Sequence, residues 1–153
     1  MFILLDIDHT ISNSFWRDPM IGAENWDKYH EASKYDKPFK KVVNFINSLA
    51  SMGYSIIAVT GRNEKFRHLT LDWFLRYHID VDELLMRPDD NFIKNAELKL
   101  SLIKQRFNGD YKQIHFALED NEDACIMYQR IGITSLQIRN ISGGQNETKY
   151  DRK

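Results

Sequence analysis

The chain begins with a short, continuously apolar run, Phe2 to Leu5, which ends abruptly at two aspartates, Asp6 and Asp8. Such a run is typical of a strand that is buried on both faces, as in a parallel sheet. In open parallel sheets, ligands bind beyond the carboxyl ends of the strands. The run therefore predicts an α/β fold with functional residues at the end of its first strand.

Strands and helices are expected to alternate along the rest of the chain. Apolar patterning predicts strands at 54–59, 83–86, 113–118 and 134–138, and helices at 63–77, 92–107 and 123–131. A further helix is expected between Lys37-Pro38 and Gly53. This alternation predicts a mostly parallel sheet with right-handed crossovers. The aromatic-rich segment from Ile11 to Tyr35 has no assignable period, and we interpret it as an insertion.

Composition limits the class of protein. With 153 residues, we expect one domain at 1–141, a small cap within it at about 11–37, and a flexible tail at 142–153. The net charge of −1 excludes proteins that coat nucleic acid with bulk positive charge. The single cysteine, Cys125, excludes a disulfide framework. Because signal-peptide and membrane-spanning patterns are absent, we expect a cytoplasmic protein with no membrane contact and no obligate protein partner.

Carboxylates follow two of the predicted strands. Asp6 and Asp8 alternate on an extended chain and are expected on one face, where one can attack and the other can move a proton. They also suit a hard cation such as Mg²⁺, to which Glu119 and Asp120 would add oxygen ligands from another strand. A solvated strand end with helix-capping aspartates is the alternative interpretation.

Groups suited to phosphate follow the second strand and lie on a later helix. The Thr60 hydroxyl and free backbone N–H groups would form an anion site, and Gly61 allows the backbone to approach the anion closely. Arg62 can bind two phosphate oxygens through its guanidinium group. Lys99 follows Asn95 by four positions and shares its helix face. Each feature alone fits an ordinary turn or a solvated helix face. Their order along the chain favours a site that handles phosphate.

With these motifs the chain resembles the haloacid dehalogenase-like (HAD) phosphohydrolases. Asp6-Ile7-Asp8-His9-Thr10 is similar to the first motif, Thr60-Gly61-Arg62 to the second, Lys99 to the third and Glu119-Asp120 to the fourth. The resemblance extends over about residues 1–138. It implies a three-layer Rossmann-like fold with a mostly parallel sheet and a small cap insertion.

The resemblance is closer still to the phosphatase domains of phage polynucleotide kinase/phosphatases. It covers the stretch 52–62 before the second motif and an arginine, Arg17, nine residues after Asp8. Two positions depart from the pattern of those domains. His9 stands where glycine is common, and Asn95 stands where they have an aspartate.

The resemblance also implies a mechanism and a cofactor. Asp6 would form an aspartyl-phosphate, and Asp8 would first protonate the leaving oxygen and then accept a proton from water. Other carboxylates would raise the pKa of Asp8 and Mg²⁺ would lower it, so the sequence leaves its charge open. The remaining roles are phosphoryl binding by Thr60, Gly61 and Lys99, orientation of Lys99 by Asn95 or Glu119, substrate binding by Arg17 and Arg62, and Mg²⁺ binding by Asp6, Asp8, Glu119 and Asp120.

Several functions are compatible with this pattern. A polynucleotide 3'-phosphatase ranks first, followed by a 5'(3')-nucleotidase or another small-molecule phosphatase. A receiver-like signalling domain is disfavoured, because its phosphoacceptor lies on a middle strand where this chain has Thr60. An inactive relative is disfavoured by the complete motif set. Trp16, Trp26 and Tyr29 fit either a base-stacking surface or the core of a cap.

Overall fold

The computed structural model describes residues 1–22 and 24–140; the tail expected at 142–153 lies outside these residues. Five strands form one sheet in the order β5-β4-β1-β6-β7, and every neighbouring pair is parallel. This confirms the predicted parallel sheet. Its strands are β1 (Phe2–Leu5), β4 (Ser55–Asn63), β5 (Glu83–Arg87), β6 (Ile114–Glu119) and β7 (Ser135–Gln137).

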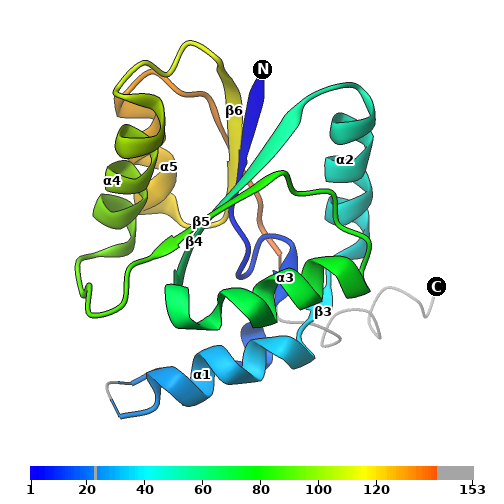
Figure 1. Cartoon of the computed structure of the whole chain (residues 1–153), viewed down its shortest axis with the longest axis vertical. Helices are drawn as coiled ribbons and strands as arrows, with labels where there is room; N and C mark the ends of the chain where they lie inside the picture. The colour runs from blue at the N-terminus through cyan, green and yellow to red at the C-terminus, as the bar shows by residue number, and fades with distance from the viewer. Residues whose placement is uncertain (23, 141–153) are drawn as a thin grey trace, which may run out of the picture.

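Helices cover both faces of the sheet, which gives the predicted three layers (Figure 1). One face packs against α2 (Lys40–Ser51) and α3 (Arg67–Arg76), and the other against α4 (Asn95–Phe107) and α5 (Glu122–Arg130). Strand β1 lies in the middle of the sheet. Its Ile3 and Leu5 belong to the first core and Leu4 belongs to the second, so the apolar run is buried on both faces.

Helices α2, α3 and α4 begin later than the sequence predicts. Lys37–Pro38 forms a short strand, β3, that pairs antiparallel with β2 (Ser12–Asn13). Strand β4 continues to Asn63, which pairs with Arg87 of β5, and a 3-10 turn then precedes α3. The chain before α4 stays outside the helix because Arg87 binds the carbonyl oxygens of Asn91 and Ile93.

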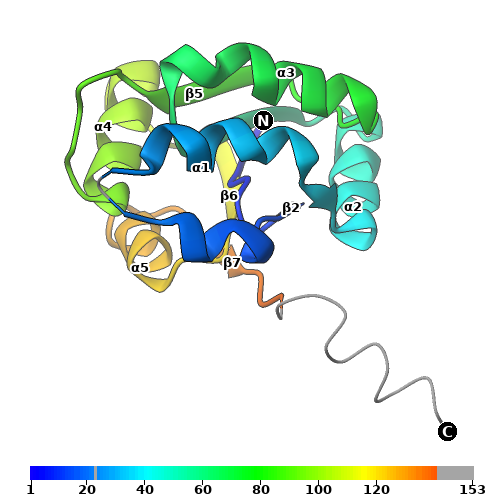
Figure 2. The same ribbon diagram turned by 90° about the horizontal axis from the view of Figure 1, so that it is seen from below.

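The described part of the aromatic-rich insertion contains regular elements. It contains two 3-10 segments, η1 (Phe15–Met20) and η2 (Ser33–Tyr35), on either side of α1 (Trp26–Ala32). Figures 1 and 2 show α1 lying across the carboxyl ends of the strands. The insertion has no apolar period because buried polar contacts anchor it to the rest of the chain. Those contacts belong to the candidate site.

Candidate active site

The carboxyl ends of β1, β4 and β6 meet at one edge of the sheet. These strands are direct neighbours. Residues that follow them are therefore brought together, and Arg62 contacts Asp8 although the two are 54 positions apart. The parallel sheet thus brings the residues at these three strand ends to one place.

Asp6 is buried and lies beside the ammonium group of Lys99. Lys99 Nζ donates to Asp6 Oδ1 at 2.6 Å and to Glu119 Oε2 at 2.5 Å. Burial alone would lower the pKa of Lys99, but the two carboxylates raise it well above its ordinary value. Lys99 therefore carries a full positive charge next to Asp6. Of the two residues expected to orient Lys99, Glu119 contacts it.

An acidic cluster surrounds this lysine. Oxygen atoms of Asp6, Glu119 and Asp120 lie within 4.8 Å of one another. Burial and the nearby charge of Asp6 raise the pKa of both Glu119 and Asp120. Three carboxylates face one ammonium group, so the cluster lacks positive charge. A divalent cation with oxygen ligands fits this donor set and would supply it.

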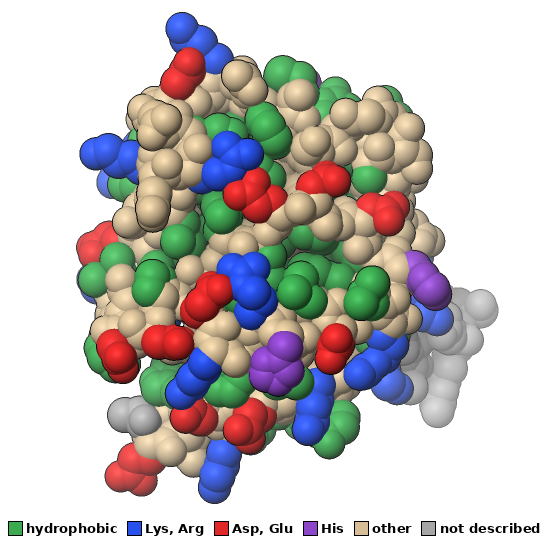
Figure 3. Space-filling model, in the orientation of Figure 1, with side chains coloured by type: hydrophobic (Ala, Val, Ile, Leu, Met, Phe, Trp, Pro, Cys, Tyr) green, Lys and Arg blue, Asp and Glu red, His purple; other side chains and the backbone are tan. Residues whose placement is uncertain are grey.

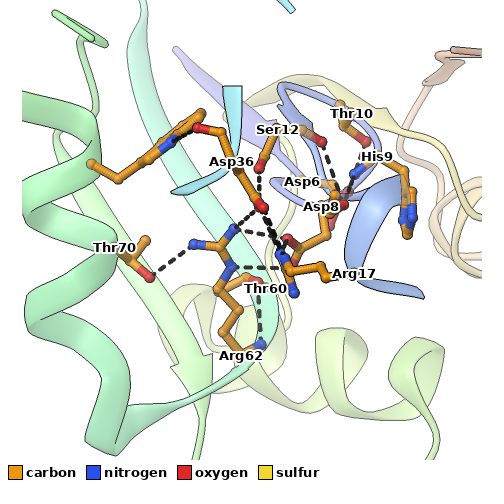
Figure 4. A network of polar contacts seen from close by, with 12 residues as sticks. Asp6, Asp8, His9, Thr10, Ser12, Arg17, Asp36, Thr60, Arg62 and Thr70 are labelled. Carbon is orange, nitrogen blue, oxygen red and sulfur yellow. Dashed lines mark hydrogen bonds and ion pairs between the residues drawn. The ribbon is translucent and has the colours of Figure 1, made fainter. Parts of the chain in front are cut away.

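The Asp8 carboxylate lies outside that cluster, between two arginines (Figure 4). Arg62 donates to it through Nε at 3.0 Å and Nη2 at 2.7 Å, and Arg17 Nη2 also donates to it. Burial alone would raise the pKa of Asp8, but Arg62 and Arg17 hold it well below its ordinary value. Crowding by carboxylates, which the sequence suggested, does not set the charge of Asp8.

Asp36 completes this network, and the sequence reasoning missed it. Its carboxylate is fully buried and accepts bonds from Arg17 Nε at 2.9 Å and Ser12 Oγ at 2.6 Å. Arg62 Nη2 lies 3.5 Å from the same group. Two buried arginines need more counter-charge than Asp8 supplies. This need for a second carboxylate could have pointed to Asp36. It becomes apparent only once both arginines are known to be buried.

The insertion holds Arg17 in place, and helix α3 holds Arg62. Arg17 comes from η1, is 0% exposed and stacks on the Tyr29 ring of α1 at 4.2 Å. Arg62 Nη1 binds Thr70 Oγ1 of α3 at 3.1 Å. Both guanidinium groups are therefore held beside Asp8 in the free protein. Polar contacts such as that of Arg17 with Asp8, and not an apolar period, attach the insertion to the rest of the chain.

The second motif borders Asn95. An added Cβ on Gly61 would lie 2.6 Å from Asn95 Oδ1, so only glycine fits here without a shift. Arg87 Nε donates to the Gly61 carbonyl at 3.0 Å and holds this irregular stretch of β4 against β5. The buried Asn95 Oδ1 has no partner among the described residues. Thr60 is buried, and its hydroxyl oxygen accepts a hydrogen bond from the backbone N–H of Arg62 at 3.2 Å.

The first motif turns at His9, which has a φ of 63°. This left-handed conformation favours glycine and explains why glycine is common at this position in the resembled family. The turn is held by Asn140, which donates to the carbonyl oxygens of His9 and Thr10. Thr10 Oγ1 in turn donates to Asp6 Oδ2 at 2.7 Å. The turn thus fixes the orientation of the Asp6 carboxylate through Thr10.

Comparison with known families agrees with this site. The family model described as the polynucleotide kinase PNKP phosphatase domain matches residues 1–142. The chain belongs to this family. It is therefore a HAD-type phosphatase, and the predicted family and enzyme class are confirmed. No curated protein matches the chain.

Solved structures share the fold. The Pnkp1/Rnl/Hen1 RNA repair complex contains a chain with 25% identity and a TM-score of 0.77, over 90% of this chain and 42% of that chain. This chain thus spans less than half of that relative. A predicted phosphatase from Clostridium acetobutylicum has 13% identity and a TM-score of 0.73, over 97% and 88%. A haloacid dehalogenase-like protein from Streptococcus pneumoniae has 14% identity and a TM-score of 0.67, over 99% and 90%.

None of the helices in 1–22 and 24–140 combines the length and the apolar character needed to cross a bilayer.

Proposed function

We propose that this chain removes a 3'-phosphate from a nucleic-acid end through an aspartyl-phosphate on Asp6. The observation that carries the proposal is the match of the PNKP phosphatase family over residues 1–142. The buried contact of Asp6 with Lys99 supports it. An anionic nucleophile next to a fixed cation suits attack on a phosphate, because the cation stabilises the charge on the transferred group.

The reaction would take two steps. An Asp6 oxygen attacks phosphorus, the bond to the leaving oxygen breaks, and Asp8 gives that oxygen a proton. Water then attacks the aspartyl-phosphate, Asp8 takes the water proton, and inorganic phosphate leaves with Asp6 restored. Thr60, the Gly61 amide and Lys99 would bind the transferred phosphoryl group.

Asp8 must change its charge during this cycle. In the free protein Arg17 and Arg62 hold it ionised, which suits the second step. We propose that an anionic substrate draws one guanidinium group away from Asp8 as it binds. The pKa of Asp8 would then rise, and a protonated Asp8 could serve the first step.

Mg²⁺ is the proposed cofactor. Asp6, Asp120 and the backbone carbonyl of Asp8 would hold it, while Glu119 remains with Lys99. When bound, Mg²⁺ screens the repulsion between an anionic nucleophile and an anionic phosphate. Asp120 is the least buried carboxylate of the acidic cluster, so it offers the most accessible ligand.

The test is Mg²⁺-dependent phosphate release from matched substrates. These are one DNA oligonucleotide with a 3'-phosphate, the same oligonucleotide with a 5'-phosphate, and a panel of mononucleotides. Selective release from the 3'-end is expected, and Asp6→Asn should abolish it while circular dichroism stays unchanged. Turnover by folded Asp6→Asn would contradict the assignment of the nucleophile.

A small-molecule phosphatase such as a nucleotidase is the second candidate. On the face shown in Figure 3, acidic and basic side chains are interspersed, and neither sign forms a continuous patch. A long polyanion gains little from such a face. Release mainly from mononucleotides would favour this candidate.

A further inference from the structure

A cavity of about 610 Å³ lies beside the candidate active site. It opens between α1, the second motif and the loop that joins β5 to α4, and Figures 1 and 2 both show this loop near the start of α1. Gly61 lines the cavity and also belongs to the proposed phosphate site. A group bound in the cavity would therefore lie next to the proposed phosphate site at Gly61. Its volume is in the range of small-molecule sites.

Aromatic side chains form two of its walls. Trp26 of α1 is 43% exposed and stacks on His30, with ring centroids 5.9 Å apart and an interplanar angle of 24°. Phe92, on the loop before α4, is 87% exposed. Apolar rings left open to solvent beside a catalytic site offer flat surfaces for another ring.

His30 adds a polar group that has no partner. It lines the cavity, is 5% exposed, and its Nδ1 atom has no hydrogen-bond partner among the described residues. Burial lowers the pKa of His30 to about 4, so the ring is neutral near pH 7. A neutral imidazole can donate or accept one hydrogen bond at this atom.

The charges around the cavity disfavour a second phosphate. Its acidic lining residues outnumber its basic ones; they are Glu24, Asp27, Asp89 and Asp90 against Lys65 and Arg87. Neither basic side chain is free. Lys65 pairs with Asp27 at 2.7 Å, and Arg87 donates to three backbone carbonyl groups. These charges favour a neutral, flat group with hydrogen-bonding edges.

We propose that this cavity binds the unpaired base of the nucleotide that carries the phosphate, with Trp26 as the stacking surface. The inference rests on the proposed function, because it places the phosphate at Asp6. It makes Trp26 a residue that determines specificity and not a catalytic residue. A base held in a duplex could not enter the cavity while paired.

The test compares two oligonucleotides with a 3'-phosphate that differ only in the terminal base, which is present in one and absent in the other. For the wild type, kcat/KM should be about 10-fold lower without the base. Trp26→Ala should lose about 10-fold on the substrate with the base, mainly through KM, and nothing on the abasic one. Trp26→Phe should retain most of the activity. Phe45→Ala, which removes an exposed aromatic ring from α2, is the matched control.

Equal losses on both substrates, or no loss on either, would overturn the inference. Binding of the same labelled oligonucleotides in the presence of a chelator supplies a second measurement that needs no turnover. There, tighter binding of the substrate with the base, abolished by Trp26→Ala, supports the cavity even if no phosphate is released. An active wild type with identical affinities for both oligonucleotides would contradict the inference alone. An inactive wild type would contradict the proposed function.

Discussion

The ammonium group of Lys99 lies 2.6 Å from Asp6 Oδ1, although 93 positions separate the two residues. Lys99 is 0% exposed and also binds Glu119. One cation thus joins the carboxylates that follow two neighbouring strands. The same contact supports the fold and places positive charge beside the proposed nucleophile.

Lys99→Met should therefore reduce both stability and activity. Removing one side of a buried ion pair costs about 3–5 kcal/mol, because Asp6 and Glu119 are left facing each other. Burial and the charge of Asp6 already raise the pKa of Glu119, and loss of the ammonium group would raise it further. The loss of stability should therefore be largest at high pH and shrink as the pH falls. Urea unfolding at several pH values measures it. Lys104→Met, at an exposed position of the same helix, is the control; a loss of equal size there would contradict this account.

Arg17→Lys and Arg62→Lys test the forked contacts around Asp8. Lysine keeps the charge but cannot bind Asp8 and Asp36 together, as each arginine does. We expect kcat to fall about 100-fold in each variant, since a small misplacement of a reacting group costs this much. The pH profile of kcat measures whether the pKa of Asp8 has changed. Arg76→Lys, on the exposed side of α3, should behave as the wild type.

Asp120→Asn should change stability and metal response in opposite directions. Without metal, loss of one carboxylate relieves repulsion in the acidic cluster, and we expect stabilisation of about 1 kcal/mol. The rise in Tm on adding Mg²⁺ should disappear together with activity. Thermal unfolding with and without Mg²⁺ measures both effects. A wild-type Tm that does not respond to Mg²⁺ would contradict the proposed cofactor site.

Gly61→Ala tests the tight contact with Asn95. The new Cβ would lie 2.6 Å from Asn95 Oδ1, so the amide must move. We expect kcat/KM to fall about 10-fold, because Gly61 itself carries the proposed phosphate-binding amide. The variant Gly61→Ala/Asn95→Ala removes the clash, so its loss should be smaller than the sum of the single losses. Additive losses would show that the contact is irrelevant.

His30 makes stability depend on pH. Its pKa is lowered from 6.5 to about 4 by burial, so the unfolded chain binds the proton more readily. Stability contributed by neutral His30 is present above pH 6.5 and is lost as pH falls toward 4, by on the order of 2 kcal/mol. His30→Phe keeps a ring between Trp26 and Phe66. Its unfolding free energy should fall less than that of the wild type between pH 6.5 and 4; parallel curves would contradict the assignment.

Much of the fold and the order of the site could be predicted from local patterns. The run from Phe2 to Leu5 specified a doubly buried strand because every side chain in it is apolar. Asp6, Thr60 and Glu119 could be placed at one edge because parallel strands bring their carboxyl ends together. The starts of α2, α3 and α4 were predicted too early, since pairing across the chain, such as Asn63 with Arg87, extends β4 beyond its apolar run.

What the amino-acid sequence determined by itself was the alternation of strands and helices and the chemical groups at the strand ends. Only the tertiary structure decided how those groups pair. Asp8 is held by Arg17 and Arg62. Asp36, which directly follows the insertion, pairs with both arginines. The physical reason is the distance along the chain over which each effect acts. Hydrophobic periodicity is a property of neighbouring residues, whereas the charge of a buried carboxylate depends on which distant cations the folded chain places beside it.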